Sequence, residues 1–278
     1  MRFDRVCSIT VGVAGETGVK ISGLHVIFAV SKSDSETMNE AKIEIYNANL
    51  STANMFKAGN RLILSAGHSQ ETGALMLFSG DITRASRLRK GADIIWSIEC
   101  LDGERSVVDK NIAVSFAAGT DGKKILKEIS AELEMTIDQL DIPSGVLRNG
   151  FAFSGAAKDA LSKITARLEM NWDIQDSNLR LYKPAVKHEG DTLEISSTSG
   201  MIGSPENVET AESTESGTPG ESIPKIQVNC LLDGRIKIGS VVVLKSETIN
   251  GKIYVSEIKH VGDTHGQEWT TTFLGVTN

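Results

Sequence analysis

The most constraining feature of this chain is residues 78–103, FSGDITRASRLRKGADIIWSIECLDG, which combine a strand pattern with turn residues and lack a catalytic grouping. Toward its end, alternate positions are apolar or small: Ile94, Trp96, Ile98 and Cys100. A period of two predicts a strand with one buried face. Lys90-Gly91 predicts a turn before this strand, and residues 78–83 predict its partner strand. The stretch therefore indicates a structural β module.

Four basic residues precede that turn and form the densest cationic stretch of the chain: Arg84, Arg87, Arg89 and Lys90. They lack the interleaved aromatic side chains on which nucleic-acid bases stack. We interpret them as a polar crossing between two strands, which presents either a solvated edge or a contact for another protein. Charged side chains on an exposed edge also prevent unwanted strand pairing.

The composition is that of an ordinary globular protein, with 278 residues of which 40% are apolar and 23% charged. At about 150 residues per domain, the length allows two domains. The apolar runs are far shorter than the ~20 residues of a membrane helix, and the N-terminus lacks the apolar core of a secretion signal. We therefore expect no membrane insertion, and assembly in the cytoplasm.

Charge and cysteine content exclude further classes. A net charge of −7, from 29 basic and 36 acidic residues, disfavours a protein that binds nucleic acid with its whole surface. Cys7, Cys100 and Cys230 are odd in number and far apart, so they predict neither a disulfide framework nor a metal knuckle. We interpret them as small buried apolar residues.

Up to about residue 105, short segments of alternating polarity indicate antiparallel strands. Besides the pair described above, the apolar positions of these segments fall within residues 7–13, 24–30, 41–45, 61–66 and 74–79. Residues 47–60 interrupt the pattern with Asn, Ser, Thr and Gly. At least six strands in about a hundred residues predict a β-sandwich or barrel.

From about residue 106 to 185 the period changes to that of helices. After Thr120, an expected N-cap, apolar residues recur at helical spacing at Ile125, Leu126, Ile129 and Leu133. A second amphipathic helix is expected between Ser154 and Asn171. A short hairpin follows over residues 172–182. This zone predicts a small α+β module.

Beyond the module, a linker leads back to strands. Residues 203–224 are rich in Ser, Thr, Gly, Glu and Pro, and predict a mobile loop or interdomain tether. Four further strands are expected over residues 226–232, 241–245, 253–260 and 267–274. Turns are expected at Asp233-Gly234, Asn250-Gly251 and His265-Gly266, with Asn250-Gly251 as the strongest hairpin signal.

Candidate reactive groups are few. His260, Asp263 and His265 lie within six residues and could offer metal ligands, but such a loop is more often a solvated hairpin turn. GSPE at 203–206 and SGAAK at 154–158 match no nucleophile or phosphate motif. We therefore predict no catalytic residue, no cofactor and no metal, and a protein that is not an enzyme.

Five stretches, taken in order, carry a resemblance to a known family. They are residues 78–104, 115–129, 196–206, 228–246 and 255–273. In this series the chain resembles the baseplate hub proteins of contractile-tailed bacteriophages. The Ser- and Glu-rich residues 207–222 depart from the resemblance, because they are longer than a simple connection.

The resemblance implies a mainly β fold, in which two tail-tube-like antiparallel β-barrel domains flank an α+β module. The barrels would be residues 1–105 and 186–278, the second with a flexible loop at 203–224, and the module would be residues 106–185. Such a hub is a structural virion protein of the tail baseplate. It forms a homotrimeric ring that joins the tail tube protein to the central spike protein, beside other baseplate proteins.

Two barrels per chain would adapt the three-fold spike to the six-fold tube, since a trimer presents six similar barrels. Genomic DNA would contact the ring only in passage through its channel. We expect subunit contacts at Arg84, Arg87 and Arg89, on the strand of Ile94, Trp96 and Ile98, and on that of Trp269, Thr271 and Phe273.

Two other functions stay open. A tail-associated peptidoglycan hydrolase would need an acidic or zinc site, and the sequence offers no motif for one. A carbohydrate-binding β module would need exposed aromatic side chains, and the chain has three Trp and three Tyr.

Overall fold

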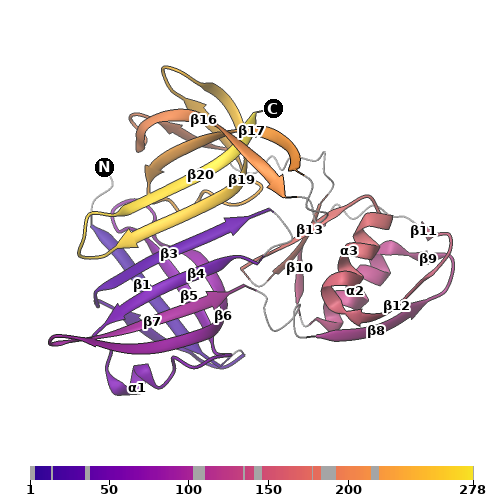
Figure 1. Cartoon of the computed structure of the whole chain (residues 1–278), viewed down its shortest axis with the longest axis horizontal. Coiled ribbons are helices and arrows are strands. Elements are labelled where there is room, and N and C mark those ends of the chain that lie inside the picture. Colours follow the sequence, from indigo (N-terminus) through magenta and orange to yellow (C-terminus); the bar gives the residue numbers. More distant parts are fainter. Residues whose placement is uncertain are drawn as a thin grey trace.

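A computed structural model describes residues 4–13, 15–34, 38–102, 110–133, 135–140, 146–176, 178–182, 192–213 and 219–277. The fold is mainly β, with 60% of the described residues in strands and 11% in helices. Figure 1 shows two β parts that lie against one another and a smaller helical module at their side.

The N-terminal β part confirms the predicted series of antiparallel strands. Its strands are β1 (Arg5–Gly12), β2 (Val19–Ser22), β3 (Val26–Ser33), β4 (Glu40–Tyr46), β5 (Arg61–His68), β6 (Gly73–Lys90) and β7 (Asp93–Leu101). Alternation places Val26, Phe28 and Val30 of β3 in the core. The interruption at 47–60 contains the short helix α1 (Leu50–Ala53), whose Thr52 N–H donates to Asn49 Oδ1 at 2.8 Å.

The α+β module contains the two predicted helices, α2 (Gly122–Glu132) and α3 (Ala157–Arg167). Its strands are β8 (Asn111–Phe116), β9 (Thr120–Asp121), β10 (Thr136–Leu140), β11 (Val146–Leu147), β12 (Phe151–Ala156), β13 (Asn171–Gln175) and β14 (Asn178–Tyr182). The predicted N-cap at Thr120 is wrong, because Thr120 lies in β9 and Asp121 accepts from the Lys123 N–H instead. The second helix begins only at Ala157, since Ser154–Ala156 extend β12 against β8.

The C-terminal β part consists of β15 (Leu193–Ser196), β16 (Met201–Ser213), β17 (Pro219–Leu231), β18 (Val241–Lys245), β19 (Asn250–Asp263) and β20 (Trp269–Thr277). The prediction of a loop at 203–224 is wrong for the described residues 203–213 and 219–224, which pair as the long hairpin β16–β17. Paired strands satisfy their backbone groups in each other, so a hairpin at a sheet edge can form without an apolar core face.

The predicted turn at Asn250-Gly251 is displaced. Both residues lie in β19, where Asn250 pairs with Lys245 and Gly251 with Leu244. The chain reverses over the preceding residues 246–249, because Asn250 Oδ1 accepts from the Ser246 N–H at 2.9 Å and Ser246 Oγ accepts from the Ile249 N–H at 2.8 Å. Side-chain hydrogen bonds therefore decided where this hairpin turns.

Strand β19 joins the two β parts. One of its edges pairs with β20, while the other pairs first with β18 and then with β3. The ladder to β20 shifts between Val255 and Glu257, close to the point where the partner on the other edge changes. Within the described residues, β1–β7 and β15–β20 thus form one sheet of 13 strands, with β2 and β16 at the ends of its main path.

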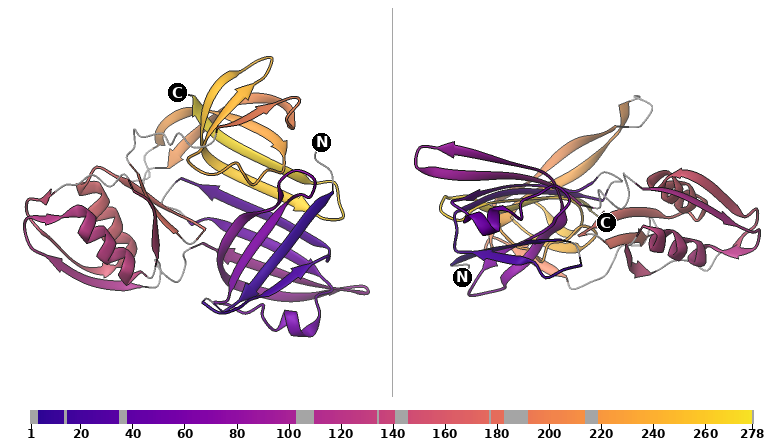
Figure 2. Two further views of the ribbon diagram at one scale, coloured as in Figure 1. Left: turned by 180° about the vertical axis from the view of Figure 1, so that it is seen from behind. Right: turned by 90° about the horizontal axis from the view of Figure 1, so that it is seen from below.

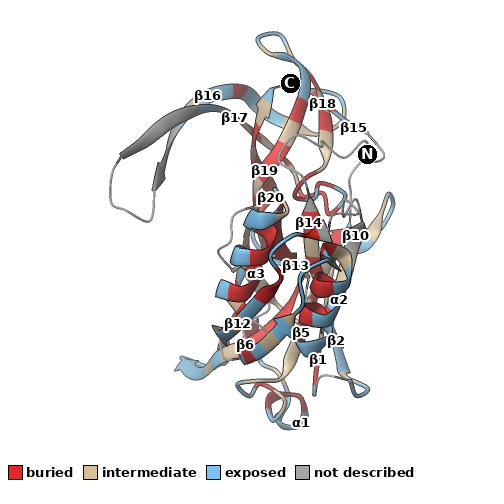
Figure 3. Ribbon diagram, turned by 90° about the vertical axis from the view of Figure 1, so that its right-hand side faces the viewer, coloured by how far each residue is buried: buried red, intermediate tan, exposed pale blue. Residues whose placement is uncertain are grey.

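The described residues bury three apolar clusters, one in each zone. The burial colours of Figure 3 show the buried faces of α2 and α3 turned into the module. Leu232 and Trp269, from the C-terminal part, belong to the N-terminal cluster, so the two β parts share apolar contacts as well as a ladder. Among the described helices, none is both long and apolar enough to cross a bilayer.

Candidate functional site

The β6–β7 hairpin extends beyond the neighbouring strands as an arm, which we define as residues 82–95 (Figures 1 and 2). Arg84, Arg87 and Arg89 are exposed on it, and no ion pair to an acidic side chain is found for them in the described part of the chain. They lie within β6, so the predicted crossing between strands is instead part of the strand. The predicted turn at Gly91 is confirmed, with φ of +62°.

Asn47 braces the arm next to its turn, and the sequence patterns did not single it out. Its side-chain amide donates to Asp93 Oδ1 at 2.8 Å and its Oδ1 accepts from the Ile94 N–H at 2.9 Å. Its own N–H donates to the Ile94 carbonyl at 2.8 Å. Asn47 has φ of +55°, a conformation that Asn tolerates better than most residues.

Four of the residues expected at subunit contacts are buried within the chain itself: Ile98, Trp269, Thr271 and Phe273. The chain's own strands cover their side chains, so the structure offers no support for subunit contacts through them, and that expectation stays a prediction. Ile98 and Trp269 belong to the N-terminal core and Phe273 to the C-terminal core. Ile94 and Trp96 are half-buried, and the Trp96 ring packs edge-on against Phe56 at 5.5 Å between centroids.

Arg5 clamps the N-terminal strand to the β19–β20 hairpin. Its guanidinium donates to the carbonyls of Asp263, Gly266 and Gln267 at 2.9, 2.6 and 2.9 Å. The same group lies 5.3 Å from the ring centre of Trp269. Carbonyl acceptors and the ring face both favour a cation, so Arg5 links the two β parts at the start of β1.

The loop with the candidate metal ligands Asp263 and His265 also helps to hold the two β parts together. Asp263 Oδ1 accepts from the His265 and Gly266 N–H groups at 2.8 Å each, and lies 2.9 Å from His25 Nε2 in the N-terminal part. His260 points elsewhere, and its Nδ1 lies 2.8 Å from Thr271 Oγ1 in the core. In the described residues, no cluster of three or more His, Cys, Asp or Glu side chains could hold a metal ion.

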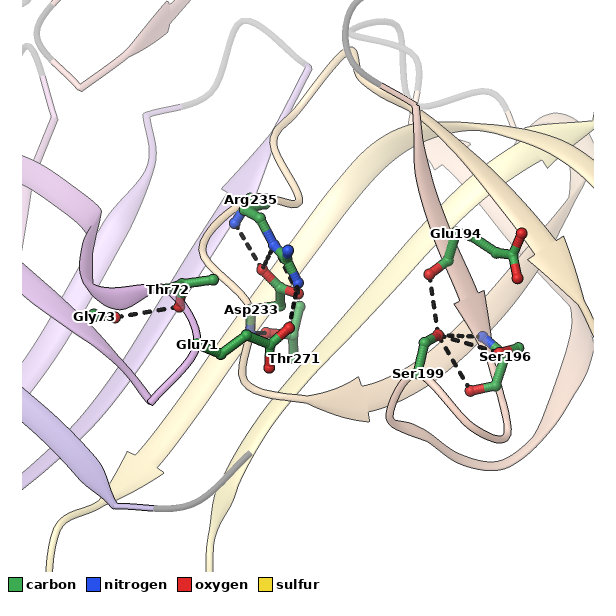
Figure 4. Close-up of polar contacts among 9 residues, drawn as sticks. All are labelled: Glu71, Thr72, Gly73, Glu194, Ser196, Ser199, Asp233, Arg235 and Thr271. Atoms are coloured by element: carbon green, nitrogen blue, oxygen red, sulfur yellow. Dashed lines mark hydrogen bonds and ion pairs between the residues drawn. The ribbon is translucent and has the colours of Figure 1, made fainter. Parts of the chain in front are cut away.

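A second link runs through the loop after β17 (Figure 4). Arg235 donates to both carboxylate oxygens of Asp233, at 2.9 Å from Nε and 2.6 Å from Nη2, and from Nη2 to Glu71 Oε1 at 3.1 Å. Glu71 lies in the turn between β5 and β6. A Cβ on Gly234 would lie 2.8 Å from Leu75 Cβ, so this position needs glycine for close packing on β6.

The α+β module docks through the turn between β13 and β14. Asp176, at φ +54°, accepts from Lys32 Nζ at 2.7 Å and from the Ser79 N–H at 3.1 Å. Asn39 donates to the Ile174 carbonyl at 2.7 Å, and Gln175 donates to the Ser33 carbonyl at 2.9 Å. The hairpin predicted from residues 172–182 therefore attaches the module to the N-terminal β part.

A cavity of about 300 Å³ lies where the three parts meet, lined in part by Lys32, Met76, Arg180, Ile236 and His260. Two of the cations that line it are paired, Lys32 with Asp176 and Arg180 with the buried Asp173. Arg180 also donates to the Ile238 carbonyl at 2.6 Å. These contacts connect the module to the C-terminal β part, so we regard the cavity as a void at a junction.

The cysteines behave as small apolar residues. Cys100 and Cys230 are buried and Cys7 is half-buried, and all three are free thiols. Burial raises the pKa of Cys7 and Cys100 to about 12, so neither is a thiolate at neutral pH.

The base of the β16–β17 hairpin is held by serine contacts, also seen in Figure 4. Ser199 Oγ accepts from the Ser196 N–H at 2.7 Å and donates to the Glu194 carbonyl at 3.0 Å. Farther along β16, Glu206 and Glu209 are exposed. The hairpin therefore leaves the body from a fixed turn and carries acidic side chains into solvent.

Solved phage tail proteins have the same fold. The chain matches the 43 kDa tail protein of prophage MuSo2 from Shewanella oneidensis with a TM-score of 0.68 and 11% identity, over 97% of this chain and 96% of that one. For the tail protein from Neisseria meningitidis MC58 the values are 0.67 and 10%, over 97% and 96%. The c3393 protein of E. coli, a component of the type VI secretion system, matches at 0.63 and 8%, over 96% and 76%.

At such low identities the structural matches show the fold class, that of phage tail proteins. The particular family comes from the sequence, because the family model described as baseplate hub gp41 matches residues 6–273. The chain therefore belongs to the baseplate hub gp41 family. No individual curated protein matches the chain.

Proposed function

We propose that this protein forms a homotrimeric ring in the baseplate of a contractile phage tail, between the tail tube and the central spike. The observation that carries the proposal is the β3–β19 ladder, which joins two β parts of one chain into a single unit. Three such chains present six β parts, so a ring with three-fold symmetry can meet a tube with six-fold symmetry.

The working surfaces of such a hub are contacts between proteins. Its partners are other copies of this chain, the tail tube protein, the central spike protein and further baseplate proteins, and phage DNA passes through the channel. The exposed Arg84, Arg87 and Arg89 on the arm, with the half-buried Ile94 and Trp96, are the candidates for contacts between subunits that the chain leaves accessible. The protein acts in the virion, after assembly in the cytoplasm of the host, and it catalyses no reaction.

The test is the mass of the purified protein in solution, alone and with its spike protein, by light scattering coupled to size exclusion. We expect a species of three copies that binds one spike trimer. A strictly monomeric species under both conditions would contradict the ring. An axial image of the tail tip should show three-fold symmetry below and six similar features above.

A further inference from the structure

Two hairpins of this chain carry opposite charge. Residues 82–92 of the β6–β7 arm contain the cations Arg84, Arg87, Arg89 and Lys90 and no acidic residue. The described residues of the β16–β17 hairpin, 201–213 and 219–224, contain Glu206, Glu209, Glu212 and Glu221 and no Lys or Arg. We call them the basic arm and the acidic hairpin. Charge of one sign concentrated on a projecting element favours a partner of the opposite sign.

The two elements stand apart within one chain. Figure 2 shows, in the view from below, the basic arm and the acidic hairpin projecting from the body at separate places. Among the described residues no ion pair joins Glu206 or Glu209 to the arm. The arginines of the basic arm and Glu206 and Glu209 of the acidic hairpin are therefore available to another molecule.

Both elements also expose apolar side chains beside their charges. Leu88 on the basic arm is 60% exposed, and Ile202 at the start of the acidic hairpin is 41% exposed. An apolar side chain surrounded by charge is the composition expected where a small contact between proteins excludes water. Within the described part of the chain, both also offer strand edges without a ladder partner: β16 on its outer side, and β6 beyond Ile82.

We propose that the basic arm of one copy binds the acidic hairpin of the next copy, head to tail. The inference rests on the proposed ring and names the surfaces that form it. A contact between two different surfaces of the same chain is heterologous, and it closes into a ring when the rotation between copies permits. The attraction is between exposed charges, so it weakens as salt screens it.

The test uses matched charge reversals on the two hairpins. One variant carries Arg84→Glu, Arg87→Glu and Arg89→Glu, which changes the net charge of residues 82–92 from +4 to −2 and makes both elements acidic. The other carries Glu206→Lys, Glu209→Lys and Glu212→Lys, which changes the net charge of residues 201–213 and 219–224 from −4 to +2 and makes both elements basic. We expect each to lower the association constant of the ring about tenfold or more, by light scattering at low salt. The chain with all six substitutions restores both pairings and should form the ring within about threefold of the natural chain.

Mixing the two variants gives a sharper readout. Within either variant both elements carry charge of the same sign, so a copy can bind only a copy of the other variant. A ring in which the two variants alternate cannot have an odd number of copies. An equimolar mixture should therefore associate into species with even numbers of copies, and leave the three-membered ring depleted. The control variant Arg84→Lys with Arg87→Lys keeps the charge and should assemble like the natural chain. Circular dichroism and thermal melting confirm that each variant folds.

Three results overturn the proposal. If both reversal variants form the ring as the natural chain does, the arm and hairpin are not its contact, while the ring itself stands. If the natural chain is monomeric in every condition, the ring fails and this contact fails with it. If the variant with Arg84→Glu, Arg87→Glu and Arg89→Glu assembles normally but no longer binds a labelled DNA duplex that the natural chain binds, the basic arm is a nucleic-acid surface.

Discussion

Arg5 and Asp263 illustrate how single polar residues hold this protein together. Arg5 donates hydrogen bonds to three backbone carbonyls of the β19–β20 turn. Asp263 accepts from a backbone N–H of that turn and contacts His25 in the N-terminal part. Neither residue belongs to a pattern of alternating or helical apolar positions. The contact of Arg5 with Asp263 and that of His25 with Asp263 each join residues more than 230 positions apart in the sequence. The join between the β parts therefore depends on side chains that look unremarkable in the sequence.

Replacing Arg5 with alanine removes three hydrogen bonds and the contact with the Trp269 ring. We expect a loss of about 1–2 kcal/mol in the free energy of unfolding, because Arg5 is exposed and water compensates in part. Urea unfolding measures it. The matched control is Arg148→Ala, at an exposed position for which the described residues show no such contacts, and it should change stability by less than about 0.5 kcal/mol. Equal effects of the two substitutions would contradict the clamp.

His260 predicts a dependence of stability on pH. Its complete burial, assisted by Lys32, lowers its pKa to about 3. The unfolded chain, with a histidine pKa of about 6.5, therefore takes up a proton first as the pH falls, so stability is full above pH 6.5 and decreases toward pH 3. At pH 5 the loss is about 2 kcal/mol.

The variant His260→Gln isolates this effect. Burial raises the pKa of Asp34 to about 6, so the folded chain takes up a proton first at this carboxyl, and stability gains from it as the pH falls from 6 to 3.8. Asp34 titrates in both proteins, so its contribution cancels in the comparison. The natural chain should lose about 2 kcal/mol more than the variant between pH 7 and pH 5. Parallel curves would contradict the assignment.

At the scale of elements, β19 and the turn between β13 and β14 connect parts that the sequence shows as separate zones. β19 divides one edge between β18 and β3, and the turn inserts Asp176 between β3 and β6. The elements themselves follow from local patterns. Their connections follow from which edges and turns meet in the folded chain.

Replacing Asp176 with alanine should detach the turn. Lys32 has only 8% of its side chain exposed, so it would become a nearly buried cation without its carboxylate, at a cost of about 3 kcal/mol. In a Lys32→Met background the same change should cost clearly less, because no cation is left unpaired. Urea unfolding of the four proteins in this cycle measures the coupling. An Asp176→Ala effect that is the same in both backgrounds would contradict the ion pair.

At the scale of the whole molecule, two β parts share a strand and apolar contacts, whereas the α+β module has a core of its own. Parts that share a ladder and a core should open together. The module, attached by a turn and a few polar contacts, should open separately. This organisation suits a hub, because the two β parts keep one relative position.

Hydrogen exchange can test this division with two matched core variants. A Cβ at Gly262 would lie 2.3 Å from Phe28 Cζ, so Gly262→Ala should strain the β3–β19 join by about 1–3 kcal/mol. It should speed exchange in β3 and β4 as well as in β17 and β20. Leu161→Ala, in the fully buried core of the module, should speed exchange in α2 and α3 alone. Faster exchange confined to β19 and β20 in the first variant would contradict the shared unit.

Local patterns in the sequence predicted most strands, both long helices and the hairpin of residues 172–182. They failed where strands form without alternating apolar residues, as in β16 and β17, and where side-chain hydrogen bonds move a turn, as at Asn250. They also placed Arg84, Arg87 and Arg89 in a crossing, although cross-strand pairing with β7 continues through them. In each case the structure depends on hydrogen bonds between residues whose pairing cannot be predicted from the spacing of apolar residues.

By itself, the sequence determined which faces of the elements are apolar, and its patterns led to the family to which the chain belongs. Only the tertiary structure decided what covers those faces. Ile98, Trp269, Thr271 and Phe273 have the alternation of an interface strand, but an apolar face is buried equally well by the same chain or by a neighbour. Here the other strands of the chain cover them, whereas the charged side chains of Arg84, Arg87, Glu206 and Glu209 on the two hairpins stay exposed.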